Sequence, residues 1–167
     1  NVLESFAANA DRASVAARAL VGALTSGCDA RAAVAASHLP LLPPASVWPL
    51  LEAAMRGHTW HDRAGACYGA RVWMASPLER VRAFVMAKEA TIVAACVYPL
   101  VEHSSEMGCD VLIQAGEALR TALALNVSAG PAQDSVDHLV GALGAGDAHA
   151  RRIVRAALAF AARRVFP

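Results

Sequence analysis

The ten residues SVWPLLEAAM at positions 46–55 are echoed by CVYPLVEHSS at positions 96–105. Each copy contains an aromatic residue, a proline, a leucine, an aliphatic residue and a glutamate in that order. The copies begin at residues 46 and 96, so they lie 50 residues apart. Recurrence at such a spacing indicates an internal repeat. If it is one, the segments that follow the two copies should also align.

The following segments do align, and both are rich in small residues. Small residues allow neighbouring helices to approach closely, so Ala66, Gly69, Ala118 and Ala122 are expected to be buried where helices meet. RAGACYGARVWM (63–74) follows the first copy and QAGEALRTALAL (114–125) follows the second. A weaker third copy, SVDHLVGALGAGD (135–147), lacks the proline and lies 39 residues beyond the second; it is followed by VRAALAFAARRV (154–165). AARALVGA (16–23) resembles the second helix of such a pair. The repeat unit is therefore a helix, a turn of about four to six residues and a second helix.

The remaining sequence also has helical periodicity. The strongest competing strand, ATIVAACVYPLV (90–101), lacks polar–apolar alternation and contains a central proline, so it is rejected as a strand. A helix opened by Ser76 and Pro77 lengthens the first repeat. The predicted helices cover residues 11–27, 29–39, 46–56, 62–74 (capped by Asp62 or Thr59), 77–88, 90–105, 110–125, 134–143 and 147–165.

Composition excludes several classes of protein. The chain has 167 residues, 56% of them hydrophobic, and a net charge of +1, which provides no electrostatic footprint for nucleic acid. No apolar stretch reaches about 18 residues, so no membrane span is expected. The four cysteines are widely separated and are expected to be reduced thiols in a cytoplasmic protein. NVS (126–128) fits the N-glycosylation pattern, which is common by chance.

Residues that could carry chemistry are few. His58, His61 and Cys67 have side chains that bind zinc, but no second pair of ligands completes four, so solvated histidines are the expected interpretation. The pair Cys109 and His103 has no motif that marks it as a nucleophile and its base. The sequence therefore predicts no enzyme, no metal and no cofactor.

The repeated glutamates, Glu52 and Glu102, could in principle form an acid–base pair. The two glutamates occupy equivalent positions on predicted outer helices, which favours solvated carboxylates over an acid–base pair. GALGAG (141–146) has no preceding strand and the wrong spacing for a phosphate loop, so it is interpreted as a turn that ends a helix.

The helix pairs with a proline in the first helix, and segments such as VRAALAFA (154–161), resemble the HEAT/armadillo superfamily. The resemblance covers roughly residues 45–165, and its motifs are degenerate. It implies an all-α fold, an α-solenoid of about four stacked antiparallel helix pairs that binds other proteins. Residues 1–167 are expected to form a single domain, a portion of a longer chain within a larger assembly. The alternative is a compact helical bundle with a small-molecule pocket or a minor enzymatic role.

Within that superfamily, TWHDRAGACYGARVWM (59–74) is similar to the tubulin-binding TOG repeats of the CLASP and XMAP type. The resemblance implies that Trp60 is an aromatic anchor and that Arg63 is the arginine that follows it. Arg151 and Arg152 would match basic residues of a later turn. The sequence departs from the pattern in its middle turn, which is acidic where tubulin-binding members are basic. A full TOG domain is also longer, so a scaffold within a larger assembly is favoured over tubulin binding.

The turns 57–61, 105–110 and 144–149 each join two helices of one pair and are expected to lie along one edge. Basic residues in the outer turns and acidic residues in the middle turn predict a stripe of alternating charge. Such a stripe suits a protein partner of mixed charge. The residues expected to bind this partner are Arg56, His58, Trp60, His61, Arg63, His149, Arg151 and Arg152.

Overall fold

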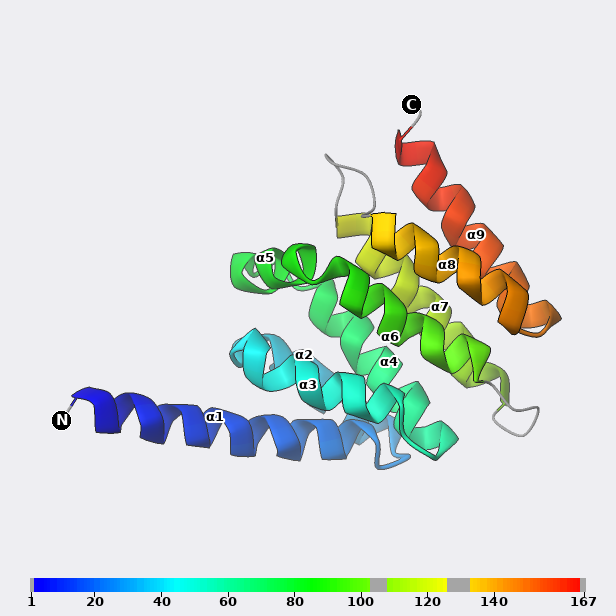
Figure 1. Cartoon of the computed structure of the whole chain (residues 1–167). Coiled ribbons are helices and arrows are strands. Elements are labelled where there is room, and N and C mark those ends of the chain that lie inside the picture. The colour runs from blue at the N-terminus through cyan, green and yellow to red at the C-terminus, as the bar shows by residue number, and fades with distance from the viewer. Residues whose placement is uncertain (1, 103–107, 126–132, 166–167) are drawn as a thin grey trace.

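The computed structural model describes residues 2–102, 108–125 and 133–165, and every regular element in these ranges is a helix (Figure 1). The prediction of an all-α fold is confirmed. The elements are α1 (Val2–Leu24), α2 (Asp29–His38), the 3₁₀ helix η1 (Leu39–Leu41), α3 (Pro44–Met55), α4 (Trp60–Met74), α5 (Glu79–Ala87), α6 (Glu89–Val101), α7 (Gly108–Leu125), α8 (Gln133–Ala145) and α9 (Ala148–Val165).

Local signals explain where two of these helices begin. Thr59 caps α4 as predicted: its hydroxyl accepts from the Asp62 amide at 3.1 Å, and the Asp62 carboxylate accepts from the Thr59 amide at 3.4 Å. This is a capping box. The predicted start of the next helix was wrong by two residues. The Ser76 hydroxyl accepts a hydrogen bond from the Leu78 amide at 3.2 Å, and α5 begins only at Glu79.

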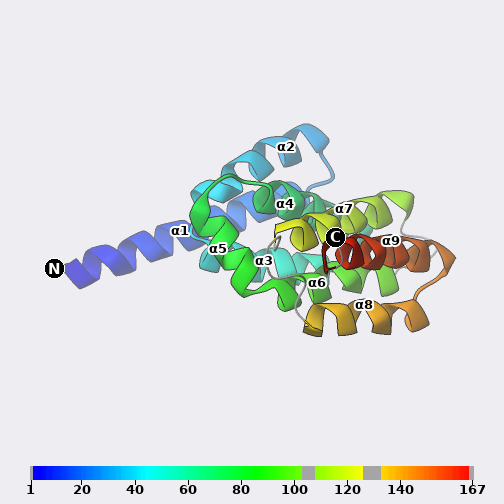
Figure 2. The same ribbon diagram turned by 90° about the horizontal axis from the view of Figure 1, so that it is seen from above.

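The helices form two rows. Helices α1, α3, α6 and α8 contact one another in that order, and so do α2, α4, α7 and α9. Each helix also packs against its partner in the other row, in the pairs α1–α2, α3–α4, α6–α7 and α8–α9. Figure 2 shows α2, α4 and α7 on one side and α3, α6 and α8 on the other. Helix α5 lies outside this scheme, between the second pair and the third.

The segment 16–23 belongs to the row of first helices, because it lies in α1, which packs against α3. The sequence analysis had matched it to a second helix, and that match was wrong. The match failed because small residues are shared by both rows wherever helices approach closely.

Burial of the first helices shows the register of the repeat. Trp48 and Leu51 are buried in α3, and the buried residues Val97 and Leu100 follow them by 49 positions in α6. The sequence alignment used a shift of 50, which places Pro49 opposite Pro99. Yet Pro49 is exposed and Pro99 is buried. The two prolines therefore do not occupy equivalent positions, contrary to the prediction.

The second helices follow the same shift of 49. Ala66 and Gly69 in α4 are buried, as are Ala115 and Ala118 in α7, whereas the sequence alignment had used a shift of 51. The predicted burial of small residues where helices meet is confirmed: Ala66, Gly69, Ala118 and Ala122 are all buried.

Two glycines of α4 let it approach α1. A Cβ at Gly65 would overlap the carbonyl group of Leu24, and a Cβ at Gly69 would overlap the Leu24 side chain. The C-terminal end of α1 therefore rests directly on the backbone of α4. This contact brings the turn after α1 next to the start of α4.

Candidate functional site

Trp60 is the first residue of α4, and the capping box described above fixes its backbone. Its side chain is 40% exposed, and its ring lies against that of His61 with centroids 3.5 Å apart. A large aromatic side chain held at a helix start and open to solvent is suited to contact a partner. The resemblance to TOG repeats predicts the same residue as an aromatic anchor.

Arg63 lies beneath this surface rather than on it. It is 7% exposed, and its guanidinium donates to the Gly57 carbonyl at 2.7 Å and to the Glu102 carbonyl at 3.0 Å. The guanidinium also lies 5.3 Å from the centre of the Tyr98 ring. Arg63 therefore ties the α3–α4 turn to the end of α6, and its side chain is not presented to solvent.

The other predicted binding residues are exposed at the ends of helices. Arg56 and His58 flank the α3–α4 turn, and Arg56 pairs with Glu52 at 3.8 Å. His149, Arg151 and Arg152 are exposed in the first turn of α9. In Figure 1 the α3–α4 and α8–α9 turns both lie toward the right-hand side of the molecule.

Only part of the predicted acidic middle turn can be located. Glu102 and Asp110 are exposed at the end of α6 and the start of α7. Glu106 and the rest of 103–107 lie outside the described residues. His103 and the NVS tripeptide also lie outside the described residues, and the side chain of Cys109 is not described.

A cleft opens beside Trp60, and the sequence analysis did not foresee it. Its volume is about 540 Å³, and its walls come from the α1–α2 turn, α2, α4 and α7. These segments are far apart in the chain, and only the packing of α4 between α2 and α7 brings them together. The lining residues are Leu24, Gly27, Cys28, Asp29, Ala32, Trp60, His61, Ala64, Gly65, Tyr68, Asp110 and Gln114.

Two carboxylates are among the polar groups of the cleft. Asp29 and Asp110 are exposed carboxylates in the first turns of α2 and α7. The Oε1 atom of Gln114 is buried and has no hydrogen-bond partner among the described residues. A buried carbonyl oxygen without a partner costs free energy.

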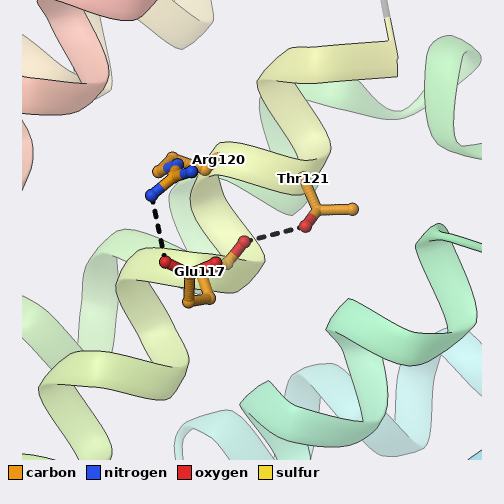
Figure 3. Close-up of polar contacts among 3 residues, drawn as sticks. All are labelled: Glu117, Arg120 and Thr121. Atoms are coloured by element: carbon orange, nitrogen blue, oxygen red, sulfur yellow. Dashed lines mark hydrogen bonds and ion pairs between the residues drawn. The ribbon is translucent and has the colours of Figure 1, made fainter.

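The cations nearest to the cleft are already engaged elsewhere. Arg71 lies over the Tyr68 ring at 5.4 Å and does not line the cleft. Further along α7, Arg120 donates to Glu117 at 3.1 Å, and the Thr121 hydroxyl donates to the Glu117 carbonyl at 2.8 Å (Figure 3). The described residues that line the cleft therefore include two carboxylates and no arginine.

The zinc interpretation of His58, His61 and Cys67 has no support in the structure. No group of three His, Cys, Asp or Glu side chains in the described part of the chain could hold a metal ion. Both histidines are exposed, whereas Cys67 is buried. Burial raises the pKa of the Cys67 thiol well above its ordinary value, with a further contribution from Cys96. Zinc binds the thiolate form, so this cysteine is a poor ligand.

The two glutamates of the repeated pentads have different surroundings. Glu52 lines a second, polar groove of about 520 Å³ between α3, α6 and α8, together with Asp134, Asp137 and His138. Glu102 lies at the end of α6, where its carbonyl group accepts from Arg63. The structure does not bring the two carboxylates together as an acid–base pair.

No described helix is by itself long and apolar enough to cross a membrane; α5 and α6 satisfy the criteria only as a pair, and they are joined by an 80° bend. No protein-family model, curated protein or solved structure matches the chain. The candidate site is therefore interpreted from its own geometry.

Proposed function

We propose that the chain is a non-enzymatic α-solenoid module that binds a protein partner along the edge containing its intra-pair turns. The two-row contact pattern supports this architecture, because successive helix pairs in a solenoid contact mainly their neighbours. Stacking of this kind repeats the same turn along one edge, so exposed side chains of several turns can act on one partner.

The observation that carries the proposal is the exposure of Trp60 beside a cleft. Tryptophan is the residue most enriched among binding hot spots, and such residues cluster where a pocket adjoins them. Trp60 is held by a capped helix start, so little conformational freedom is lost when a partner covers it. Arg56 and His58 are exposed in the same turn as Trp60, and Arg151 and Arg152 are exposed in the turn of the last pair, where they supply polar groups to the same partner.

The partner that suits this edge is a protein surface of mixed charge. Basic residues flank the edge, while Glu102 and Asp110 lie between them in the chain. A uniformly acidic surface such as tubulin would face these carboxylates at a cost. We therefore place the module in a larger cytoplasmic assembly, where the free thiols of Cys28, Cys67 and Cys96 are stable, and tubulin serves as a purified test partner.

The test is the Trp60→Ala variant, compared with Met86→Ala. Met86 is 42% exposed, close to the value for Trp60, but lies on α5. We expect Trp60→Ala to weaken partner binding by at least about 2 kcal/mol, the hot-spot scale. Met86→Ala should leave binding unchanged, and both variants should melt within a few degrees of the parent protein.

Binding partners are captured from the source cell with the parent protein, and a purified partner is then titrated against all three proteins by calorimetry. Tubulin is titrated in parallel. Equal affinities of the parent and Trp60→Ala proteins for the partner would refute the proposal. A collapse in the melting temperature of Trp60→Ala would instead show that the ring supports the fold.

A further inference from the structure

We propose that the cleft beside Trp60 binds an arginine side chain presented by the partner. This inference rests on the proposed function and names the chemistry of the group that enters the cleft. It is carried by the set of side chains that α2, α4 and α7 bring together there, and not by any one of them.

The cleft has the dimensions of a side-chain pocket. Its volume of about 540 Å³ is within the range of small-ligand sites, about 300–1,000 Å³. Ala64 and Gly65 line it on α4. Gly65 cannot be enlarged, because a Cβ there would overlap the Leu24 carbonyl. The end of α1 therefore packs directly on α4 beside the cleft.

Aromatic rings of α4 line the same space. Trp60 and Tyr68 are eight residues apart, which places both on one face of the helix. The Tyr68 ring already has the Arg71 guanidinium at 5.4 Å, whereas the cation–π contacts of the described residues include none to Trp60. Tryptophan is the ring that attracts cations most strongly. An incoming guanidinium can therefore stack on Trp60.

Hydrogen-bond acceptors stand around these rings. The side chains of Asp29, Asp110 and Gln114 all line the cleft. Asp110 and Gln114 are one helical turn apart on α7, so their side chains lie on the same face. A guanidinium carries five donors in a rigid plane, which matches a set of acceptors beside an aromatic ring.

The charge balance also favours a cationic group. Arg63 is turned away toward the Gly57 and Glu102 carbonyls, and Arg120 is paired with Glu117. The positive ends of α2 and α7 offset part of the negative charge, since Asp29 and Asp110 lie in their first turns. An acidic side chain would meet both carboxylates, and an apolar one would leave both without a cationic partner.

Cys28 provides a direct readout of occupancy, because it lines the cleft and is exposed while Cys67 and Cys96 are buried. The rate of Cys28 alkylation is measured in a Cys109→Ser protein. The probes are capped Gly-Ser-X-Ser-Gly peptides, in which X is arginine, its uncharged isostere citrulline, lysine or glutamate. We expect the arginine peptide to slow alkylation several-fold at saturation and the citrulline and glutamate peptides to have no effect.

Variants of the carboxylates test the recognition itself. Asp29→Asn and Asp110→Asn should each weaken protection by the arginine peptide by about two- to fivefold, as for partly exposed ion pairs. Asp134→Asn, a matched neutralisation in the second groove, should have no effect. Circular dichroism confirms that each variant is folded; if one aspartate variant fails to fold, the other and Gln114→Leu decide.

Several results would overturn the inference. Among them are equal protection by the citrulline peptide, stronger protection by the glutamate peptide, and no protection by the arginine peptide up to its solubility limit. Stronger protection by lysine than by arginine would assign the cleft to an ammonium group instead. If Trp60→Ala abolishes partner binding but both aspartate variants retain it, the inference fails while the proposed function stands. If Trp60→Ala leaves partner binding intact, the proposed function fails, whatever the peptides show.

Discussion

Arg63 shows how one buried cation can hold a turn. A guanidinium in the interior is costly unless its donors are satisfied. Here Nε and one terminal nitrogen donate to the carbonyl groups of Gly57 and Glu102, and both carbonyls belong to chain segments that end helices. Carbonyl groups at helix ends lack partners within their own helix. Arg63 therefore satisfies orphan acceptors of two helix ends with one side chain.

Replacing Arg63 by glutamine should destabilise the protein by about 1–3 kcal/mol, because both carbonyl acceptors lose a charged donor. Arg120→Gln is the control: its ion pair with Glu117 is largely exposed, so its loss should change stability by less than about 1 kcal/mol. Urea unfolding followed by tryptophan fluorescence measures both. Equal midpoints for the two variants would show that the Arg63 contacts contribute nothing.

The resemblance to TOG repeats predicted a different role for Arg63. Sequence position alone placed it one turn after Trp60, where either an exposed or a buried side chain is possible. Which face of α4 points inward depends on α3, α6 and α7, and a local pattern contains no information about their final positions. For Trp60 the sequence left open whether the ring contacts a partner or folds back over the helix ends; the residue is 40% exposed.

At the scale of the helices, the ends of the helices were predicted better than the shift between the repeats. Capping residues and glycines marked most helix ends within a few positions. The shift between repeats was wrong because the alignment followed the residue identity of Pro49 and Pro99, whereas burial follows the packed face. One residue of shift in a helix rotates a side chain by about 100°, enough to move it from the core to solvent.

The cleft could not have been predicted in the same way. Its acceptors come from the starts of α2 and α7, and its rings come from α4. The packing of α4 between α2 and α7 sets the distances between them, and the close approach of α1 to α4 at Gly65 and Gly69 places the α1–α2 turn beside them. The sequence indicated that these glycines allow close packing, but not which helix would approach them.

The Gly69→Leu variant tests this close approach. A side chain at position 69 would overlap that of Leu24, so overpacking should cost about 1–3 kcal/mol. Gly141→Ala is the control, because a Cβ there meets nothing within 4 Å and alanine favours a helix by about 1 kcal/mol. Thermal unfolding should therefore shift in opposite directions for the two variants. An unchanged midpoint for Gly69→Leu would mean that α1 can move away at little cost.

At the scale of the whole molecule, one hydrophobic core runs through all four pairs. Its buried residues extend from Ala17 in α1 to Ala157 in α9. Contacts within this core are nevertheless mainly local, because in the described part of the chain α8 and α9 pack chiefly on α6 and α7. The buried hydrogen bond from the Ser135 hydroxyl to the Glu89 carboxylate, 2.8 Å long, fastens α8 to α6. Stability in such an array should depend on nearest neighbours.

This locality leads to a prediction that separates a stacked array from a compact bundle. Leu139 is fully buried in α8, so Leu139→Ala should cost about 2–5 kcal/mol. In a stacked array most of that loss is confined to the last pair. Amide hydrogen exchange should then accelerate in α8 and α9 while the slowest amides of α3 and α4 keep their rates. Uniform acceleration across all helices would show that the chain opens only as a whole, as a compact bundle does, and would argue against the proposed solenoid.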